Sequence, residues 1–376
     1  MIRVYVPYVG DGLAAGICTI NGTRIQIDCG SMQNAELAFY KGLVRIYPEV
    51  FFLSHFHADH YNGLLNAISS KQHYRFRIRQ VFYPRIPQFQ DRRKFVLYML
   101  AMNHYILGDT TGSMAADFLR VLSRINRNFF EYKALSAGEL VTVGEVQYEV
   151  LWPPAEIDED STLKVIGRAI DDFENALEED EGLRRIVKEV EKGREMDQYT
   201  STELESGNMP GDMPGDMDKY DRLDSMISLR ERRNMPESVR KANSSLRKAA
   251  NHLSLAFHED NKLLFLGDLE SYDIRRVVEL LGSKGRNRFF VTITAHHGTH
   301  RDESLYRIRT CYAVSSVGRR LFQYLSPDYG RISNIHLNTY LNGDIKVHPC
   351  SPPWYSHRAW LCRSMFPGFQ SAECLW

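Results

Sequence analysis

Four side chains of the kind that bind metal ions lie within six residues of one another, at His55, His57, Asp59 and His60. In an extended segment alternate side chains point to the same face, so the imidazoles of His55 and His57 are expected to point together. Imidazole and carboxylate ligands without a thiolate suit Zn, Mn or Fe(II). The spacing therefore predicts that two metal ions share this loop, the first two histidines binding one ion and Asp59 and His60 the other.

Three apolar segments, at residues 50–53, 263–266 and 289–294, are each followed by residues able to bind a metal. Their length and apolar content predict buried strands. The ligand-type residues that follow them are the histidine loop, Asp268, and the pair His296 and His297. Since the ends of several strands line one edge of a sheet, these side chains are expected to meet there.

The rest of the pattern is rich in strands with helices between them. The Asn21-Gly22 pair predicts a hairpin of residues 15–20 with 24–28, because both residues tolerate positive φ. Helical spacing of apolar residues predicts mainly helix over 88–134. The other expected elements are strands at 3–8, 74–83, 147–153, 254–257 and 311–316, helices at 33–43 and 62–69, and a second hairpin of 334–341 with 345–348 around Asn342-Gly343.

The composition changes between residues 155 and 248, where the chain becomes charged and poor in aromatic residues. A tandem Met-Pro-Gly-Asp at 209–216 cannot continue a helix or a strand. We interpret 155–248 as an insertion of two or three exposed helices around a flexible tip, with an apolar stripe near 183–190 that packs on the rest. The insertion divides the expected core domain into halves at 1–154 and 249–348, and a tail at 349–376 follows.

Together, these motifs resemble those of the metallo-β-lactamase superfamily: Asp28 after a hairpin, His-x-His-x-Asp-His at 55–60, Gly267-Asp268, and His296-His297-Gly298. The later segments are similar to the soluble metallohydrolase domain of ComEC-type DNA-uptake proteins. The matching stretches are Asn251-His-Leu-Ser-Leu255, Leu266-Gly-Asp268, His296-His-Gly-Thr299 and Ser316-Val-Gly318. The Asn-Arg-Tyr-Gly-His-Pro stretch expected after the last motif is absent, and Arg319 and Arg320 follow instead.

The resemblance implies an α/β (α+β) fold, a four-layer αββα sandwich with two divalent metal ions, Zn or Mn with Fe as an alternative, at the edge between two sheets. It assigns His55, His57 and His252 to the first ion and Asp59, His60 and His296 to the second, with Asp268 bridging the two. His297 would position or protonate a substrate oxygen, although which of His296 and His297 binds the metal is left open. Asp28 would support the histidine loop from behind, and Asp59 and His297 are the expected catalytic residues.

Metal-assisted hydrolysis by a bridging hydroxide is the expected reaction. Phosphodiesters of DNA, RNA or a nucleotide come first as substrates, because of the ComEC-type resemblance. Arg319, Arg320 and Thr299 are the expected substrate contacts, while His300 is expected at the surface. Arg75, Arg77 and Arg79 alternate with apolar residues, which indicates either a phosphate-binding strand face or a solvated one.

Two other functions stay open. The same site could hydrolyse an amide, an ester or a thioester, or the chain could be the effector subunit of an assembly that binds a protein partner through 155–248. The 376 residues carry 47 basic and 47 acidic side chains, so bulk electrostatic coating of nucleic acid or membrane is not expected. Six scattered cysteines and the lack of a long apolar run predict a cytoplasmic protein that does not enter the membrane.

Overall fold

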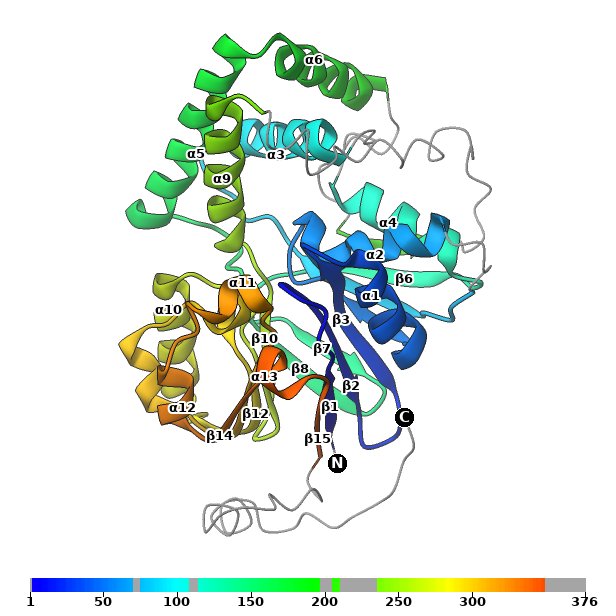
Figure 1. Ribbon diagram of the computed structural model, residues 1–376, viewed down its shortest axis with the longest axis vertical. Coiled ribbons are helices and arrows are strands. Elements are labelled where there is room, and N and C mark those ends of the chain that lie inside the picture. Colours follow the sequence, from blue (N-terminus) through cyan, green and yellow to red (C-terminus); the bar gives the residue numbers. More distant parts are fainter. Residues whose placement is uncertain (1, 70–74, 108–113, 197–204, 210–234, 349–376) are drawn as a thin grey trace.

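The computed structural model describes residues 2–69, 75–107, 114–196, 205–209 and 235–348. Within these ranges two β-sheets form the centre of the protein (Figure 1). The first sheet has eight strands in the order β15-β1-β2-β3-β4-β5-β6-β9. Their bounds are β1 Arg3–Val6, β2 Gly12–Cys18, β3 Arg24–Ser31, β4 Val50–Phe52, β5 Gln80–Pro84, β6 Phe130–Leu135, β9 Ser206–Met209 and β15 Ile345–Val347.

The second sheet has seven strands in the order β14-β13-β12-β11-β10-β8-β7. Strands β11 to β14 run parallel, and β7, β8 and β10 are antiparallel to their neighbours. The bounds are β7 Leu140–Val143, β8 Val146–Trp152, β10 Ala256–Glu259, β11 Leu263–Phe265, β12 Arg288–Ile293, β13 Arg309–Ser315 and β14 Ser333–Asn338. The carboxyl ends of β11 and β12 therefore lie at the same edge, each followed by predicted ligand residues.

Helices cover the outer face of each sheet. The helical segments are α1 Ala35–Ala38, η1 Phe39–Val44, α2 Ala58–Ser69, α3 Arg92–Leu107, α4 Met114–Ile125, α5 Asp160–Glu179, α6 Glu181–Met196, α9 Glu237–Asn251, α10 Ser271–Ser283, η3 Ala295–Gly298, η4 Glu303–Arg307, α11 Arg319–Phe322, α12 Asp328–Ile332 and α13 Thr339–Asn342. Helices α1, η1, α2 and α4 pack on the first sheet, and α10, η4 and α12 pack on the second, whereas α3, α5, α6 and α9 pack against one another (Figure 1).

Three apolar layers separate the four layers of structure, and neighbouring residues of one strand serve different layers. In β4, Phe51 packs against the helices while Phe52 packs between the sheets. In β11, Leu264 packs against α10, while between the sheets Phe265 contacts Phe257, which in turn contacts Phe52. This period of two is what a strand buried on both faces requires. The predicted αββα order is confirmed.

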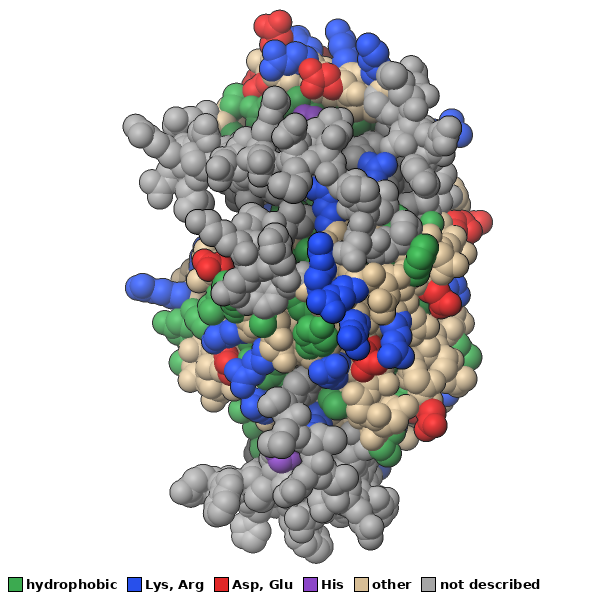
Figure 2. Space-filling view, turned by 90° about the vertical axis from the view of Figure 1, so that its right-hand side faces the viewer, with side chains coloured by type: hydrophobic (Ala, Val, Ile, Leu, Met, Phe, Trp, Pro, Cys, Tyr) green, Lys and Arg blue, Asp and Glu red, His purple; other side chains and the backbone are tan. Residues whose placement is uncertain are grey.

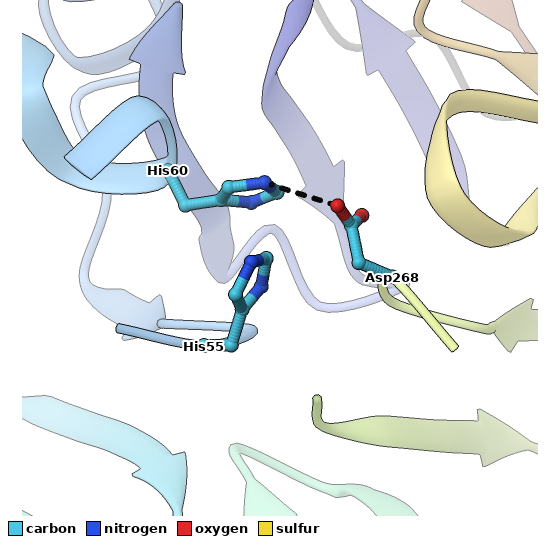
Figure 3. Close-up of side chains that lie close together, drawn as sticks. All are labelled: His55, His60 and Asp268. Atoms are coloured by element: carbon cyan, nitrogen blue, oxygen red, sulfur yellow. Dashed lines mark ion pairs between the residues drawn. The ribbon is translucent and has the colours of Figure 1, made fainter. Parts of the chain in front are cut away.

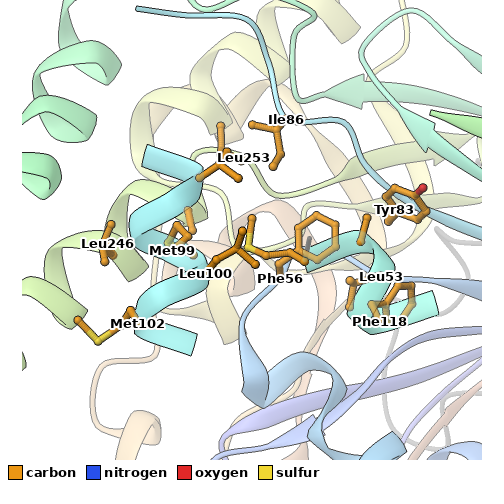
Figure 4. Close-up of a cluster of buried hydrophobic side chains, with 14 of the residues drawn as sticks. Leu53, Phe56, Tyr83, Ile86, Met99, Leu100, Met102, Phe118, Leu246 and Leu253 are labelled. Atoms are coloured by element: carbon orange, nitrogen blue, oxygen red, sulfur yellow. The ribbon is translucent and has the colours of Figure 1, made fainter. Parts of the chain in front are cut away.

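The inserted region contributes three described helices, α5, α6 and α9, and the strand β9. Buried residues of α9, among them Leu246, and Leu253 just beyond its end, join Met99 and Leu100 of α3 and Phe56 beside the histidine loop (Figure 4). Strand β9 pairs antiparallel with β6 at the edge of the first sheet, a pairing that the sequence did not predict. The insertion is thus part of the core next to the predicted site. The tandem repeat beyond Met209 and the 349–376 tail lie outside the described residues.

The first hairpin is confirmed, with Cys18 opposite Arg24 and Gly22 at positive φ. The second predicted hairpin is wrong: β14 pairs parallel with β13 in the second sheet, whereas β15 crosses to pair with β1 in the first. Residues 88–134 are mainly helical as predicted, through α3 and α4, but β6 begins at Phe130, before the predicted end. The burial pattern of β6, with both ends buried and the middle exposed or half-buried, fits neither the period of a strand nor that of a helix well. Among the described helices, none is long and apolar enough to cross a membrane.

Candidate metal centre

The histidine loop connects β4 to α2 and is held close to β3. The first turn of α2 forms within this loop, since the amide of His60 donates to the carbonyl of His57 at 2.9 Å. Gly30 of β3 lies against the same turn, because a Cβ atom placed there would come within 2.2 Å of the carbonyl oxygen of Asp59. Only glycine allows this approach, and it presses the loop against the sheet edge.

Asp28 holds the loop from behind, at the position the resemblance implied. Its carboxylate is fully buried and accepts from the backbone amide of Ser54 at 2.7 Å and from the Ser54 hydroxyl at 2.6 Å. It also lies 2.7 Å from Nδ1 of His60. An ionised carboxylate only accepts, so the hydrogen on His60 is on Nδ1 and points at Asp28. Asp28 stands at φ 53, a left-handed conformation that Asp tolerates better than most residues.

The Ser54 hydroxyl fixes the tautomer of a second histidine. Its single hydrogen points to Asp28, so it accepts from Nδ1 of His55, which lies 3.0 Å away. The Nδ1 nitrogens of His55 and His60 are therefore both protonated and both occupied behind the loop. Their Nε2 nitrogens point forward, away from the support. This is how a carboxylate usually orients a metal-ligating histidine.

Two buried imidazole nitrogens in this region, on His57 and His252, have no described hydrogen-bond partner. Nε2 of His55 lies 2.8 Å from Nδ1 of His57, and Nε2 of His57 is buried with no partner among the described residues. His252, at the end of α9, is held by Asp273 with Nδ1 2.8 Å from Oδ2, and its Nε2 is likewise buried and without a described partner. The segment after His252 lies along the loop, since the amide of Leu255 donates to the carbonyl of Ser54 at 2.7 Å. Orphaned imidazole nitrogens of this kind fit a divalent cation.

Asp268, which follows β11, lies opposite His60 (Figure 3). Its Oδ2 is 3.4 Å from Nε2 of His60, 3.7 Å from Nε2 of His297 and 3.8 Å from Nε2 of His296. His297 is buried, and its Nδ1 lies 2.9 Å from the carbonyl of Ser316, which leaves Nε2 for the site. Ligand atoms of His55, His60 and Asp268 all lie within 4.8 Å of one another. We call these three residues the buried cluster.

The charges of this region are set by burial and by one another. Burial lowers the pKa of His55 well below its usual value and that of His57 to about 3, so both offer lone pairs at neutral pH. Burial also opposes charge on His60, but Asp268 and Asp28 raise its pKa well above the usual value. Burial alone would raise the pKa of Asp268, yet His60 and the neighbouring histidines hold it well below its ordinary range. Excess negative charge facing an imidazole is the setting in which a cation replaces the proton.

A residue that the sequence did not single out lies on the site. Arg247 of α9 places Nη2 3.0 Å from Oδ1 and 2.9 Å from Oδ2 of Asp59. Asp59 is buried, and although burial would raise its pKa, Arg247 and the histidines keep it well below the usual value. The Arg247 side chain is 38% exposed, so the guanidinium is reachable from solvent. Arg247 was missed because only the direction of the inserted helix brings it to Asp59.

The predicted substrate contacts lie outside this cluster. Arg319 and Arg320 begin α11 and line a surface groove together with Asp11 and Gln33. Arg320 lies 3.7 Å from Asp11 through Nε, and neither arginine has a described contact with the buried histidines. The hydroxyl of Thr299 donates to the carbonyl of His296 at 2.7 Å and is occupied within its own turn. Their role in binding substrate stays a prediction.

Comparisons with known proteins find similarity among solved structures alone. No family model and no curated protein matches the chain. Among solved structures, it is similar to the metallo-β-lactamase fold protein YhfI from Bacillus subtilis, with a TM-score of 0.37 and 8% identity over 93% of this chain and 100% of that one. The four-layer αββα arrangement rests on the sheets and helices themselves.

Two further structures share similarity over smaller parts of their own length. One is a long form RNase Z from yeast, with a TM-score of 0.36 and 11% identity over 83% of this chain and 37% of that chain. The other is MEM-A1, a subclass B3 metallo-β-lactamase from a soil metagenome library, with a TM-score of 0.22 and 15% identity over 39% of this chain and 48% of that chain. The description of the fold and of the site rests on the contacts within this chain.

Proposed function

We propose that this protein is a metal-dependent hydrolase with two divalent ions, acting on phosphodiesters. One observation carries the proposal: the Nε2 nitrogens of His55 and His60 are turned forward by Asp28 and Ser54 toward Asp268. A group of imidazoles oriented by a buried carboxylate, facing a second carboxylate, is the donor set of Zn and Mn hydrolase sites.

The residues divide between two ions as the sequence motifs imply. His55, His57 and His252 would hold the first, and Asp59, His60 and one of the last two histidines would hold the second, with Asp268 between them. Bound there, the ions would supply Lewis acidity and an activated water molecule. Nδ1 of His297 is fixed by the Ser316 carbonyl, so His297 fits a ligand role through Nε2 better than a mobile acid.

Arg247 supports an anionic substrate. Only its Nη2 contacts Asp59, and the planar guanidinium has further N–H groups with which to bind phosphate oxygens beside the ions. Figure 2 shows that Lys and Arg side chains also gather on one face of the molecule, where acidic ones are fewer. Arg77 and Arg79 are exposed on either side of buried Ile78, although they precede β5 rather than lie in it. The ComEC-type motifs of the sequence favour the same substrate class.

The test begins with metal analysis of the purified protein, followed by a substrate panel with that metal. The panel contains single- and double-stranded DNA, RNA, bis(p-nitrophenyl) phosphate, a chromogenic β-lactam and a thioester. We expect cleavage of phosphodiesters that requires the metal and is lost in His57→Ala. His348→Ala is the matched control, since His348 follows β15 and is only partly buried.

Two results would contradict the proposal. Cleavage of the β-lactam or the thioester with no phosphodiester cleaved would keep the hydrolase and reject the substrate class. Metal-loaded protein without any hydrolytic activity would reject the hydrolase and favour the assembly role predicted for residues 155–248.

A further inference from the structure

A second group of ligand-type side chains lies beside the buried cluster. Nδ1 of His296 is 2.7 Å from Nδ1 of His300, and the latter is 3.4 Å from Oε2 of Glu270. Ligand atoms of all three lie within 4.8 Å of one another. Their side chains are 25%, 28% and 15% exposed, for His296, His300 and Glu270 in turn. We call these three residues the rim cluster.

The three ligand atoms meet at a point rather than forming a chain. Nδ1 of His300 is the atom that faces both His296 and Glu270. A proton relay would use the two different nitrogens of His300, one toward each neighbour. A single N–H on Nδ1 of His300 can donate well either to His296 or to Glu270. Hydrogen bonding therefore explains only one of these two contacts. A cation held by two nitrogens and one carboxylate oxygen explains both, because each atom offers a lone pair to a common centre.

The backbone turns the Nδ1 nitrogens of His296 and His297 toward different partners. His296 and His297 follow β12 with φ of 45° and 60°, two consecutive residues in the left-handed region. Such strain in non-glycine residues is found where function requires a side chain to be placed. The turn sends Nδ1 of His297 to the Ser316 carbonyl and Nδ1 of His296 to His300. Since His297 offers Nε2 to the buried cluster, His296 is available for a separate site.

The other two ligands are also held in place. Glu270 is the N-cap of α10 in a capping box with Asp273, and Nδ2 of Asn251 donates to its Oε1 at 3.1 Å, which leaves Oε2 facing His300. The carbonyl of His300 accepts from the Tyr329 hydroxyl at 2.9 Å. Ligands fixed by their surroundings bind a metal with little loss of conformational freedom.

We propose that the rim cluster is a third cation site, a two-histidine, one-carboxylate site for Zn or Mn with its remaining positions open to solvent. Two nitrogens bound to one Zn at about 2.0–2.1 Å lie roughly 3 Å apart, so the imidazoles need to move little. The proposal goes beyond the proposed reaction: it uses His296 in the rim cluster and therefore assigns His297, rather than His296, to the second ion of the proposed function.

The test is metal stoichiometry by mass spectrometry after equilibrium dialysis against Zn or Mn. We expect His300→Ala and Glu270→Gln each to bind one ion fewer per chain than the wild type. Both changes lie at partly exposed positions, and Glu270→Gln keeps the shape of the cap. His348→Ala should bind as many ions as the wild type, and His57→Ala should lose ions from the buried cluster while keeping the one that His300→Ala loses.

Equal stoichiometry in the wild type, His300→Ala and Glu270→Gln would overturn the proposal and leave the rim cluster as a hydrogen-bonded pair beside a capping glutamate. If His300→Ala bound fewer ions but lost its far-ultraviolet circular dichroism, Glu270→Gln would decide. A double variant, His57→Ala with His300→Ala, separates the two sites: we expect its loss to equal the sum of the two single losses, and a smaller loss would contradict independent sites.

Discussion

The buried cluster and the rim cluster are built from similar residues, yet they are supported differently. Behind the buried cluster, Asp28 and Ser54 occupy the second nitrogens of His55 and His60. In the rim cluster the imidazoles contact each other directly, with a third of their surface or less in solvent. The ligands of the buried cluster are thus part of the protein core, whereas those of the rim cluster lie at its surface.

Because the two clusters differ in burial, removing a partner residue has a different energetic cost in each. Asp28 is fully buried beside His60, and separating two such partners leaves an uncompensated charge in the interior. The rim residues can be hydrated if a partner is removed. We therefore expect changes behind the buried cluster to affect folding and metal binding together, and changes in the rim cluster to affect metal binding alone.

The largest effect is expected from Gly30→Ala. The added Cβ would meet the Asp59 carbonyl at 2.2 Å, and backbone on both sides must move. Such overpacking lowers the free energy of unfolding by about 1–3 kcal/mol. Displacing the loop by about 1 Å is expected to reduce kcat/KM on the order of 100-fold. Urea unfolding and steady-state kinetics measure the two effects.

Gly282→Ala is the control for that change. Gly282 lies in α10, where an added Cβ would meet nothing within 4 Å. Alanine is favoured over glycine in a helix, so stability should stay the same or rise. Equal behaviour of the two variants would mean that the close approach of β3 does not hold the loop.

The second effect, on metal affinity, is expected from Asp28→Asn. Asn keeps the shape and tolerates the left-handed backbone of this position, but it removes the charge that orients His60. Loss of a carboxylate behind a ligand typically lowers metal affinity about 10- to 100-fold. Competition with a chromogenic chelator measures the affinity. Asp171→Asn on the exposed face of α5 is the control, and an unchanged affinity in Asp28→Asn would make Asp28 merely a turn residue.

The buried cluster could largely be predicted from the sequence, because its ligands are concentrated after apolar strands. His55, His57, Asp59 and His60 are nearly contiguous, so their shared loop follows from local geometry alone. Asp268 follows because β11 is a short apolar run with a polar end. The four-layer order was predicted only through the resemblance, since periodicity does not say which strands pair.

What failed to be predicted depends on contacts between distant segments. The Asn342-Gly343 pair is a good local signal for a hairpin, yet β15 pairs instead with β1 as the edge strand of the first sheet, with Val347 opposite Val4 at the other end of the chain. His300 was expected at the surface, because no local pattern tells that Glu270 lies against it. Arg247 belongs to a charged stretch in which every arginine resembles a solvated one.

The third effect is expected from Arg247→Ala. This change removes the guanidinium that contacts Asp59 beside the buried cluster. Removing the guanidinium takes away a phosphate-binding group beside Asp59, so KM for phosphodiesters should rise on the order of 10-fold while metal content stays unchanged. Arg247→Lys should recover part of the loss. Arg240→Ala, an exposed position on the same helix, is the control. A fall in KM in Arg247→Ala would instead show that Arg247 blocks the site.

The smallest effect on stability is expected from His300→Ala, compared with His60→Ala, both measured in metal-free protein. His300 is partly exposed and its ring leaves no buried partner charge, so the free energy of unfolding should change by no more than about 0.5 kcal/mol. His60→Ala removes the partner of buried Asp28 and Asp268, and breaking a buried pair lowers stability by about 3–5 kcal/mol. Urea unfolding after dialysis against a chelator measures both. Similar losses in the two variants would mean that the rim cluster is as much a part of the core as the buried one, and the distinction between them would fall.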